Sequence, residues 1–218
     1  MSAASLAAQL LNGLASASSL FVVSAGLTLI FGVTRIVNFA HGSLYMIGAY
    51  VAYSAGTALG AYGDSPLAFW WAALLAAIAV GCIGALIERL LLRRLYAAPE
   101  LLQLTATFGV VLIVRDATLA LFGAEDRLGP RVEGLDGAVQ WFGRAIPQYD
   151  LFLLVTGPVV LIALTLLMQR TRFGLLVRAA SENRILASAL GIDERKLFTA
   201  VFALGAFLAG LAGALTLP

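Results

Sequence analysis

The sequence predicts an all-α, polytopic transmembrane helical bundle of about six spans, and three observations lead to that prediction. Of the 218 residues, 61% are hydrophobic and only 12% are charged, about half the charged content of an ordinary soluble domain. The mean hydropathy is +0.95. Long uncharged intervals divide the chain, starting with the one that precedes Arg35. The near balance of 14 basic and 12 acidic residues argues against a nucleic-acid-binding protein.

Apolar intervals give the expected spans in order along the chain. They cover residues 6–34, 36–63, 65–87, 101–123, 151–169 and 197–218. A helix of about 20 residues crosses the roughly 30 Å of hydrocarbon in a bilayer, and each interval is close to that length or longer. The first interval is not read as a signal peptide, because it has no basic n-region and its apolar run is too long.

The distribution of Lys and Arg predicts the orientation of the spans. Short loops rich in these residues stay in the cytoplasm, which places residues 88–94 and 170–196 inside. Two spans separate these stretches, so the polar, turn-rich loop 124–150 lies outside, and it carries more acids than bases. Counting back through the first three spans places the N-terminus outside.

Small residues spaced one helical turn apart predict the packing faces of the bundle. Helices in lipid approach closely where such residues line a face. The second span carries Gly48, Ala52, Gly56 and Gly60 at four-residue spacing. Similar stripes occur in the third span (Ala73, Ala77, Gly81, Ala85) and in the sixth (Gly205, Ala209, Gly213 beside Ala206, Gly210, Ala214).

A polar run, RIVNFAHGS at residues 35–43, lies between the first two apolar intervals and contains the only histidine, His41. Polar side chains at membrane depth need partners or a water-filled cavity. The run is therefore either a cytoplasmic turn, in which Asn38 and His41 cap helix ends, or part of a translocation path that includes Ser43. The residues alone favour the turn.

Two adjacent charges, Arg115 and Asp116, interrupt the fourth interval. Either charge costs about 2.5–3.5 kcal/mol at the bilayer centre, so neither should face lipid. Neighbouring positions on a helix point in different directions, so each needs its own partner. A tie to another helix or snorkelling toward the outer interface is favoured over a role in lining the translocation path.

Residues 171–193 are too polar to span a membrane but show helical periodicity. The periodic positions are Leu175, Arg178, Glu182, Ile185, Ala189 and Ile192. They predict one amphipathic helix at 175–191 on the cytoplasmic surface, which Gly191 is suited to end. Such a helix either rests on lipid headgroups or inserts into a groove on a cytosolic partner.

Catalytic chemistry has little support in the sequence. Cys82 is the only cysteine, so thiols can form neither an intrachain disulfide nor a metal cluster, and no cofactor or metal is expected. An intramembrane hydrolase would pair His41 with Ser24 or Ser54, but no glycine-framed nucleophile motif surrounds these serines. No phosphate-binding loop is present, so any ATP would be bound by another chain. We therefore expect a protein that is not an enzyme.

Three stretches together resemble LivH-type permeases, the membrane subunits of bacterial ABC importers for branched-chain amino acids. Residues 26–50, GLTLIFGVTRIVNFAHGSLYMIGAY, resemble the N-terminal signature of these permeases. Residues 170–192 resemble their cytoplasmic loop, and residues 202–215 resemble the Gly/Ala-rich helix that follows it. The order of polar residues in the first stretch is not a generic transmembrane pattern.

The resemblance implies a single membrane permease domain over residues 1–218 that works by alternating access. The implied partners are a second permease subunit, homologous or identical, two cytosolic ATP-binding subunits and a periplasmic substrate-binding protein that contacts the loop 124–150. The path residues would be Asn38, His41, Ser43, Arg115 and Asp116. The helix 175–191 would couple to the ATPase through Arg178, Ala179, Ser181, Glu182, Ala189 and Gly191.

Two features qualify the resemblance. The family usually continues past the Gly/Ala-rich helix, so the chain is expected to be C-terminally short. Ser43 favours the amino-acid branch over the related urea permeases. The alternatives are a permease for urea or short amides and a stand-alone channel or secondary transporter, and copurification of an ATP-binding subunit with the 170–196 loop would exclude the latter.

Overall fold

The structure is a computed structural model that describes residues 3–59, 67–125, 127, 129, 132–141 and 144–218. Its elements are α1 (Ala3–Thr34), α2 (His41–Ala58), α3 (Ala68–Ile87), the π-helical turn η1 (Glu88–Leu92), α4 (Arg93–Leu95), α5 (Glu100–Phe122), β1 (Ala138–Trp141), β2 (Arg144–Pro147), α6 (Gln148–Arg170), α7 (Arg172–Glu182), α8 (Arg184–Ala189) and α9 (Glu194–Leu215). The apolar intervals form helices, since a helix satisfies its own backbone groups in lipid. The predicted all-α membrane bundle is confirmed.

Five of the described helical segments are long and apolar enough to cross a membrane, which makes the chain a multi-pass membrane protein. The first is α1, and the second is the continuous helix formed by α3, η1 and α4. The other three are α5, α6 and α9. Helix α2 is 18 residues long and is not among them. The predicted second span, 36–63, was wrong at its start, because the helix begins only at His41. Residues 60–63 of that span, with Gly60 of its stripe, lie outside the described residues.

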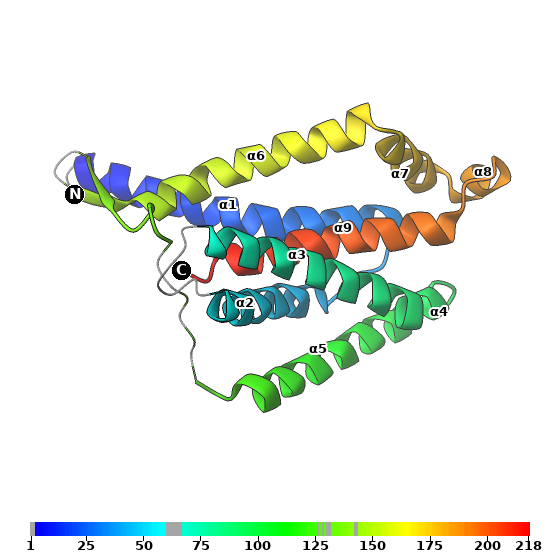
Figure 1. Cartoon of the computed structure of the whole chain (residues 1–218). Coiled ribbons are helices and arrows are strands. Elements are labelled where there is room, and N and C mark those ends of the chain that lie inside the picture. Colours follow the sequence, from blue (N-terminus) through cyan, green and yellow to red (C-terminus); the bar gives the residue numbers. More distant parts are fainter. Residues whose placement is uncertain (1–2, 60–66, 126, 128, 130–131, 142–143) are drawn as a thin grey trace.

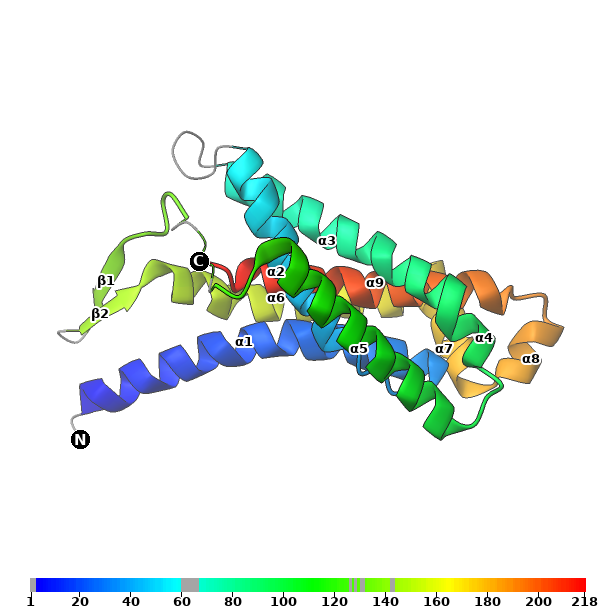
Figure 2. The same ribbon diagram turned by 90° about the horizontal axis from the view of Figure 1, so that it is seen from below.

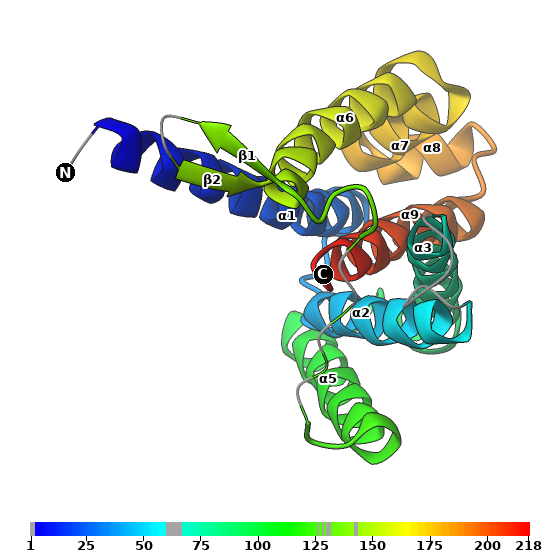
Figure 3. The same ribbon diagram turned by 60° about the vertical axis from the view of Figure 1, so that its left-hand side comes forward.

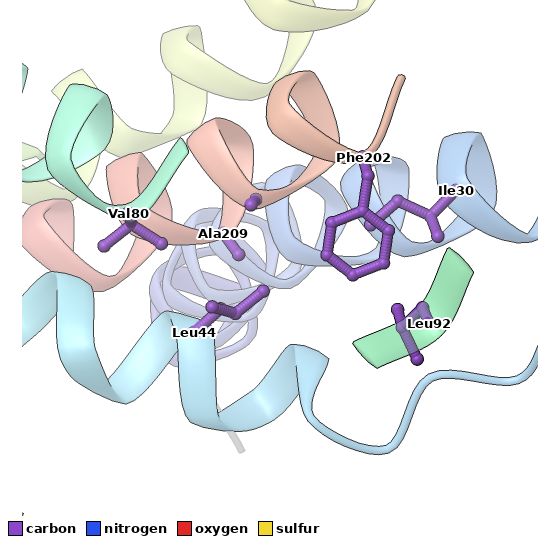
Figure 4. Close-up of a cluster of buried hydrophobic side chains, with 7 residues drawn as sticks. Ile30, Leu44, Val80, Leu92, Phe202 and Ala209 are labelled. Carbon is purple, nitrogen blue, oxygen red and sulfur yellow. The ribbon is translucent and has the colours of Figure 1, made fainter. Parts of the chain in front are cut away.

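Helix α9 occupies the centre of the bundle and packs against α1, α2 and α3 (Figure 3). Of the residues in its most apolar 18-residue stretch, 72% are buried, whereas the corresponding share for α5 and for α6 is 6%. Buried apolar side chains of α9 pack in one cluster with side chains of α1, α2 and α3 (Figure 4). They include Ile30 of α1, Leu44 of α2, Val80 of α3, and Phe202 and Ala209 of α9. The core therefore surrounds α9, and α5 and α6 lie at the periphery.

Glycines allow α9 to approach its neighbours backbone to backbone, as the small-residue stripes predicted. A Cβ atom added to Gly26 of α1 would lie 2.5 Å from the carbonyl oxygen of Gly205 in α9. A Cβ added to Gly48 of α2 would lie 2.5 Å from the carbonyl oxygen of Gly210. Both distances are too short for any side chain larger than hydrogen, so the contact requires glycine at these positions.

The two ends of the bundle differ in composition. One end, here called the Arg-rich end, gathers α4, α7, α8 and the start of α9 (Figures 1 and 2). The other, here called the hairpin end, holds the start of α1, the antiparallel β1–β2 hairpin and the end of α9. The loop expected at 124–150 therefore contains a short hairpin, and α6 starts at Gln148 rather than at Leu151. The gathering of the two basic stretches at one end agrees with the predicted parity of the spans.

Helix α5 stands apart from the rest of the bundle. It lies over α2 when the molecule is seen from below and on the outer side of α2 in the turned view (Figures 2 and 3). The rings of Tyr50 and Phe122 join the two helices, with centroids 4.5 Å apart. At its other end, the amide of Gln103 donates to the carbonyls of Leu95 and Ala98, both at 3.0 Å. The contacts of α5 are thus concentrated at its two ends.

Candidate functional site

The α1–α2 connector, residues 35–40, runs back into the bundle instead of turning at its surface. Nε2 of His41, the residue after the connector, donates to the carbonyl of Val23 at 2.9 Å. Val23 precedes the end of α1 by eleven residues, about 16 Å along a helix. The interpretation of 35–43 as a cytoplasmic turn was therefore wrong. Non-helical backbone is tolerated at such depth where it is buried in protein or lines a cavity.

Arg35 begins the connector in a conformation that L-amino acids rarely adopt. Its φ is 56°, and its amide donates to the carbonyl of Phe31 at 2.8 Å, which ends α1. Its guanidinium donates to the carbonyl of Ser181 at the end of α7, at 3.3 Å. The connector is thereby attached to the helices of the Arg-rich end.

Three of the predicted path residues are close in the sequence, and all three are buried. The exposed fractions of Asn38, His41 and Ser43 are 3%, 3% and 7%. Oδ1 of Asn38 accepts a hydrogen bond from the amide of Ala40 at 3.1 Å, so it stabilises the local turn. His41 caps no helix end, contrary to the capping interpretation, because its ring bonds to α1. Ala40 is the N-cap of α2 and makes no side-chain cap.

Two buried polar atoms of this site have no hydrogen-bond partner among the described residues: Nδ2 of Asn38 and Nδ1 of His41. Nε2 of the imidazole donates to a carbonyl, so in the neutral ring Nδ1 is an acceptor. Nδ2 of the amide is a donor. Buried polar groups are normally paired, and an unpaired one costs about 1–3 kcal/mol. The site therefore offers one donor and one acceptor to a further polar group.

The hydrolase pairing of His41 with a serine does not form in the described part of the chain. The Ser54 hydroxyl donates to the carbonyl of Tyr50 at 2.9 Å, and Ser24 is exposed. Because Nε2 of His41 bonds a main-chain carbonyl, it activates no hydroxyl.

Residues 171–193 form two helices, α7 and α8, where the sequence predicted one. Asn183 breaks the helix with extended backbone (φ −146°, ψ 97°), and its Oδ1 caps α8 by accepting from the amide of Leu186 at 3.0 Å. Asparagine favours such caps over helix interiors. The prediction for Gly191 is confirmed: its φ is 83°, and the amide of Ile192 donates to the carbonyl of Ala187 at 3.1 Å, which ends α8.

The break also changes which face of the segment is buried. Gly174, Val177 and Ala180 of α7 and Ala187 of α8 face the bundle, so the stripe predicted from Leu175 to Ile192 does not form the buried face. Three large apolar side chains of the α8 region face outward, here called the α8 apolar surface: Ile185, Leu186 and Leu190, which are 85%, 57% and 75% exposed. Such a cluster on a polar segment is typical of a docking surface.

The residues expected to couple to the ATPase are divided between the surface and the bundle. Glu182, Ala189 and Gly191 are exposed, whereas Ala179 and Ser181 are half-buried. The guanidinium of Arg178 donates to the carbonyl of Met168 in α6, so it attaches α7 to the end of that helix. Just beyond α8, the amide of Lys196 donates to Asp193 and holds the pKa of that carboxyl below its usual range.

Arg115 and Asp116 do not join the other predicted path residues. Both side chains are exposed on α5, the peripheral helix, and neither has an ion pair within the described ranges. Thr107 and Thr118 are buried on the same helix. Asn38, His41 and Ser43 are thus all buried at or next to the start of α2, whereas this pair is exposed on α5.

Comparison with known proteins decides the family. The sequence model described as "Branched-chain amino acid transport system / permease component" matches residues 9–218. The chain belongs to this permease family. It is 31% identical over 212 residues to the high-affinity branched-chain amino acid transport system permease protein BraD of Pseudomonas aeruginosa, covering 95% of this chain and 69% of that protein.

Further relatives in the branched-chain amino acid permease family come from other organisms. LivH of Escherichia coli is 28% identical over 95% of this chain and 69% of its own length. The probable LivH of Methanocaldococcus jannaschii is 35% identical over 94% of this chain and 65% of its own length. No solved structure matches the chain.

One polar cluster of this permease, centred on Glu88, was not predicted from the sequence. Glu88 is completely buried, and its carboxylate pairs with Arg93 at 2.9 Å and accepts from the hydroxyls of Tyr96 at 3.0 Å and Thr199 at 2.6 Å. Burial, followed by the nearby Glu88 carboxylate, raises the pKa of the Tyr96 phenol. In an α-helix, residues five apart differ by about 140° in direction, so helical periodicity does not pair Glu88 with Arg93. Only the glutamate that closes an uncharged interval could have drawn attention to the site.

Proposed function

We propose that this permease is the membrane-spanning subunit of an ATP-binding cassette importer for branched-chain or related amino acids and that it carries no catalytic activity itself. The observation that carries the proposal is the buried site of Asn38 and His41 at the end of the connector, together with the names of the relatives. A donor and an acceptor inside an apolar bundle suit a zwitterion, since a carboxylate accepts hydrogen bonds and an ammonium group donates them.

The Arg-rich end would face the cytoplasm of a bacterial inner membrane, with the N-terminus on the periplasmic side. Its support is the positive-inside rule, because two basic stretches meet at that end. The periplasmic substrate-binding protein would then contact the hairpin end. A cavity of about 390 Å³ there is lined in part by Asp136, Gly137 and Asp150.

A second permease subunit, homologous or identical, would cover the exposed face of α5. The support is the pair Arg115 and Asp116, since charges exposed on a spanning helix cost about 2.5–3.5 kcal/mol at the bilayer centre unless a polar partner faces them. On this proposal the pair reaches the translocation path only within the assembled complex.

One of the two cytosolic ATP-binding subunits would dock on α7 and α8 of this chain, and the other on the second permease subunit. The α8 apolar surface supports this placement, because a helix that presents large apolar side chains fits a groove on a partner. Glu182, Ala189 and Gly191 lie exposed on the same segment. Movement of the docked subunits would displace α7 and α8 as rigid bodies and alternate the access of the path.

Replacing Ile185, Leu186 and Leu190 together by serine is expected to lower copurification of the ATP-binding subunit at least about tenfold, because truncating central apolar anchors costs 2 kcal/mol or more. The measurement is affinity purification of the complex from membranes with quantitative blotting of both subunits. Leu101→Ser is the matched control, since Leu101 is 76% exposed near the same end but belongs to α5. Recovery of the ATP-binding subunit with the triple variant equal to that with the unaltered permease would contradict the placement. Transport by the permease in the absence of any ATP-binding subunit would favour a stand-alone channel.

A further inference from the structure

The carboxylate of Glu88 lies at 0% exposure where α3 enters its π-helical turn. Burying a charge costs several kcal/mol unless partners compensate. Here Nη2 of Arg93 donates to Oε2 at 2.9 Å and Nε donates to Oε1 at 3.3 Å, a two-point contact. The hydroxyl of Thr199, on α9, donates to Oε2 at 2.6 Å and accepts from Arg93 at 2.6 Å. The cluster therefore joins the end of α3 to α9.

The π-helical turn creates this geometry. In η1 the hydrogen bonds run between residues five apart, and such turns occur often at functional sites. The i, i+5 alignment brings Arg93 over Glu88, which a regular α-helix would not do. The wider π-helical turn therefore allows the ion pair between Glu88 and Arg93 to form.

Aromatic rings extend the cluster to α8. The guanidinium of Arg184, the first residue of α8, lies 4.6 Å from the ring centroid of Phe198 and 5.8 Å from that of Tyr96. These two rings pack edge to face with centroids 5.3 Å apart. The hydroxyl of Tyr96 donates to Glu88 at 3.0 Å, so contacts run without a gap from α8 to the buried carboxylate. Arg184 also pairs with Glu194 at the start of α9.

We propose that Glu88 is a positioning residue that makes α8, the end of α3 and α9 move as one rigid body, so that displacement of α8 by a bound ATPase reaches the centre of the bundle. The proposal rests on the proposed function. Separating α3 from α9 would take the Thr199 hydroxyl away from the buried Glu88 carboxylate, while the pair with Arg93 stays within the helix that continues α3. Because a buried carboxylate that loses a hydrogen-bond donor is destabilised, the joint stays closed during motion. Helix α9 contacts α1, α2 and α3, and it carries the displacement to the helices around the Asn38 and His41 site.

The test uses the complete complex in lipid nanodiscs and compares basal ATPase activity with the activity stimulated by binding protein and leucine. We expect Glu88→Gln to keep the basal ATPase activity and the yield of the complex. The stimulation by binding protein and leucine should fall at least about fivefold, which is the lower end of the effects that ordinary allosteric coupling produces. Tyr96→Phe, a milder change, is expected to lose part of it. Glu100→Gln is the control, since Glu100 is exposed at the start of α5.

A distance measurement separates coupling from simple stability. Spin labels at Leu90→Cys and Ser188→Cys, both exposed positions, report the separation of η1 from α8 in a Cys82→Ala background. We expect one distance, unchanged by ATP, in the otherwise unaltered protein and a broadened distribution with Glu88→Gln.

Full stimulation and an unchanged distance in the Glu88→Gln variant would overturn the inference. If the Glu88→Gln variant misfolds, Tyr96→Phe becomes the deciding variant. Unaltered stimulation and an unaltered distance in Tyr96→Phe would then overturn the inference. If the unaltered complex itself shows no stimulation by leucine and binding protein, the proposed function fails instead, so the two failures are distinguishable.

Discussion

Replacement of Gly26 by valine is expected to prevent stable assembly of the bundle. Its Cβ would lie 2.5 Å from the carbonyl oxygen of Gly205 and 3.2 Å from Cε1 of His41. The nearest atom belongs to the backbone of α9, which cannot move away as a flexible side chain could. Overpacking a close-packed interior costs about 1–3 kcal/mol, and here the valine methyl groups add to a contact that is already too short. We expect loss of most of the monodisperse protein in detergent, measured by size-exclusion chromatography after mild heating.

Gly32→Val is the matched control for this prediction. Gly32 lies on the same helix, is exposed, and has open space where its Cβ would be. Recovery of monodisperse protein with Gly32→Val should equal that of the unaltered chain. Equal recovery with both variants would show that α1 and α9 do not approach through Gly26 and Gly205.

Replacement of His41 by alanine or glutamine is expected to lower leucine uptake roughly fivefold while the complex still assembles. The two variants separate the roles of the two ring nitrogens. Glutamine can still donate to the Val23 carbonyl, as Nε2 does at 2.9 Å, but it lacks an acceptor at the position of Nδ1. One lost hydrogen bond to a transported solute is worth about 1 kcal/mol, which corresponds to a rate change of about fivefold. Uptake of labelled leucine by cells that contain the whole importer measures the effect.

The serine on the same helix provides the control for His41. Ser54→Ala removes an exposed hydroxyl that donates to the Tyr50 carbonyl of its own helix, so uptake should not change. If His41→Gln leaves uptake unchanged while His41→Ala lowers it, the ring is needed only as an anchor to α1, and Nδ1 takes no part in the path.

Uncharged apolar intervals were sufficient to predict the five spanning helices, and small-residue stripes predicted faces by which helices pack, but the start of α2 was not predicted. Uncharged intervals became helices because lipid leaves the backbone no other partner. The stripes containing Gly48 and Gly205 became close contacts because in lipid van der Waals packing brings helices together, and only small residues permit it. These properties depend on local composition, which a single sequence shows directly.

Three features could not be predicted, because each depends on a choice made in three dimensions. The depth of the connector is set by the bond between His41 and Val23, eighteen residues apart. At Asn183 the side chain caps α8 and the helix is interrupted. The sequence pattern is compatible both with this break and with one continuous helix. The pairing of Glu88 with Arg93 needs a π-helical turn, which has no periodic signature.

The most direct test of the proposed function is leucine accumulation in proteoliposomes that contain this permease, its partner permease and the ATP-binding subunits. The proposal predicts that labelled L-leucine accumulates only when ATP and the substrate-binding protein are both present, that unlabelled isoleucine and valine compete, and that urea does not. Leucine flux that needs neither ATP nor the binding protein, or transport of urea in place of leucine, would contradict it.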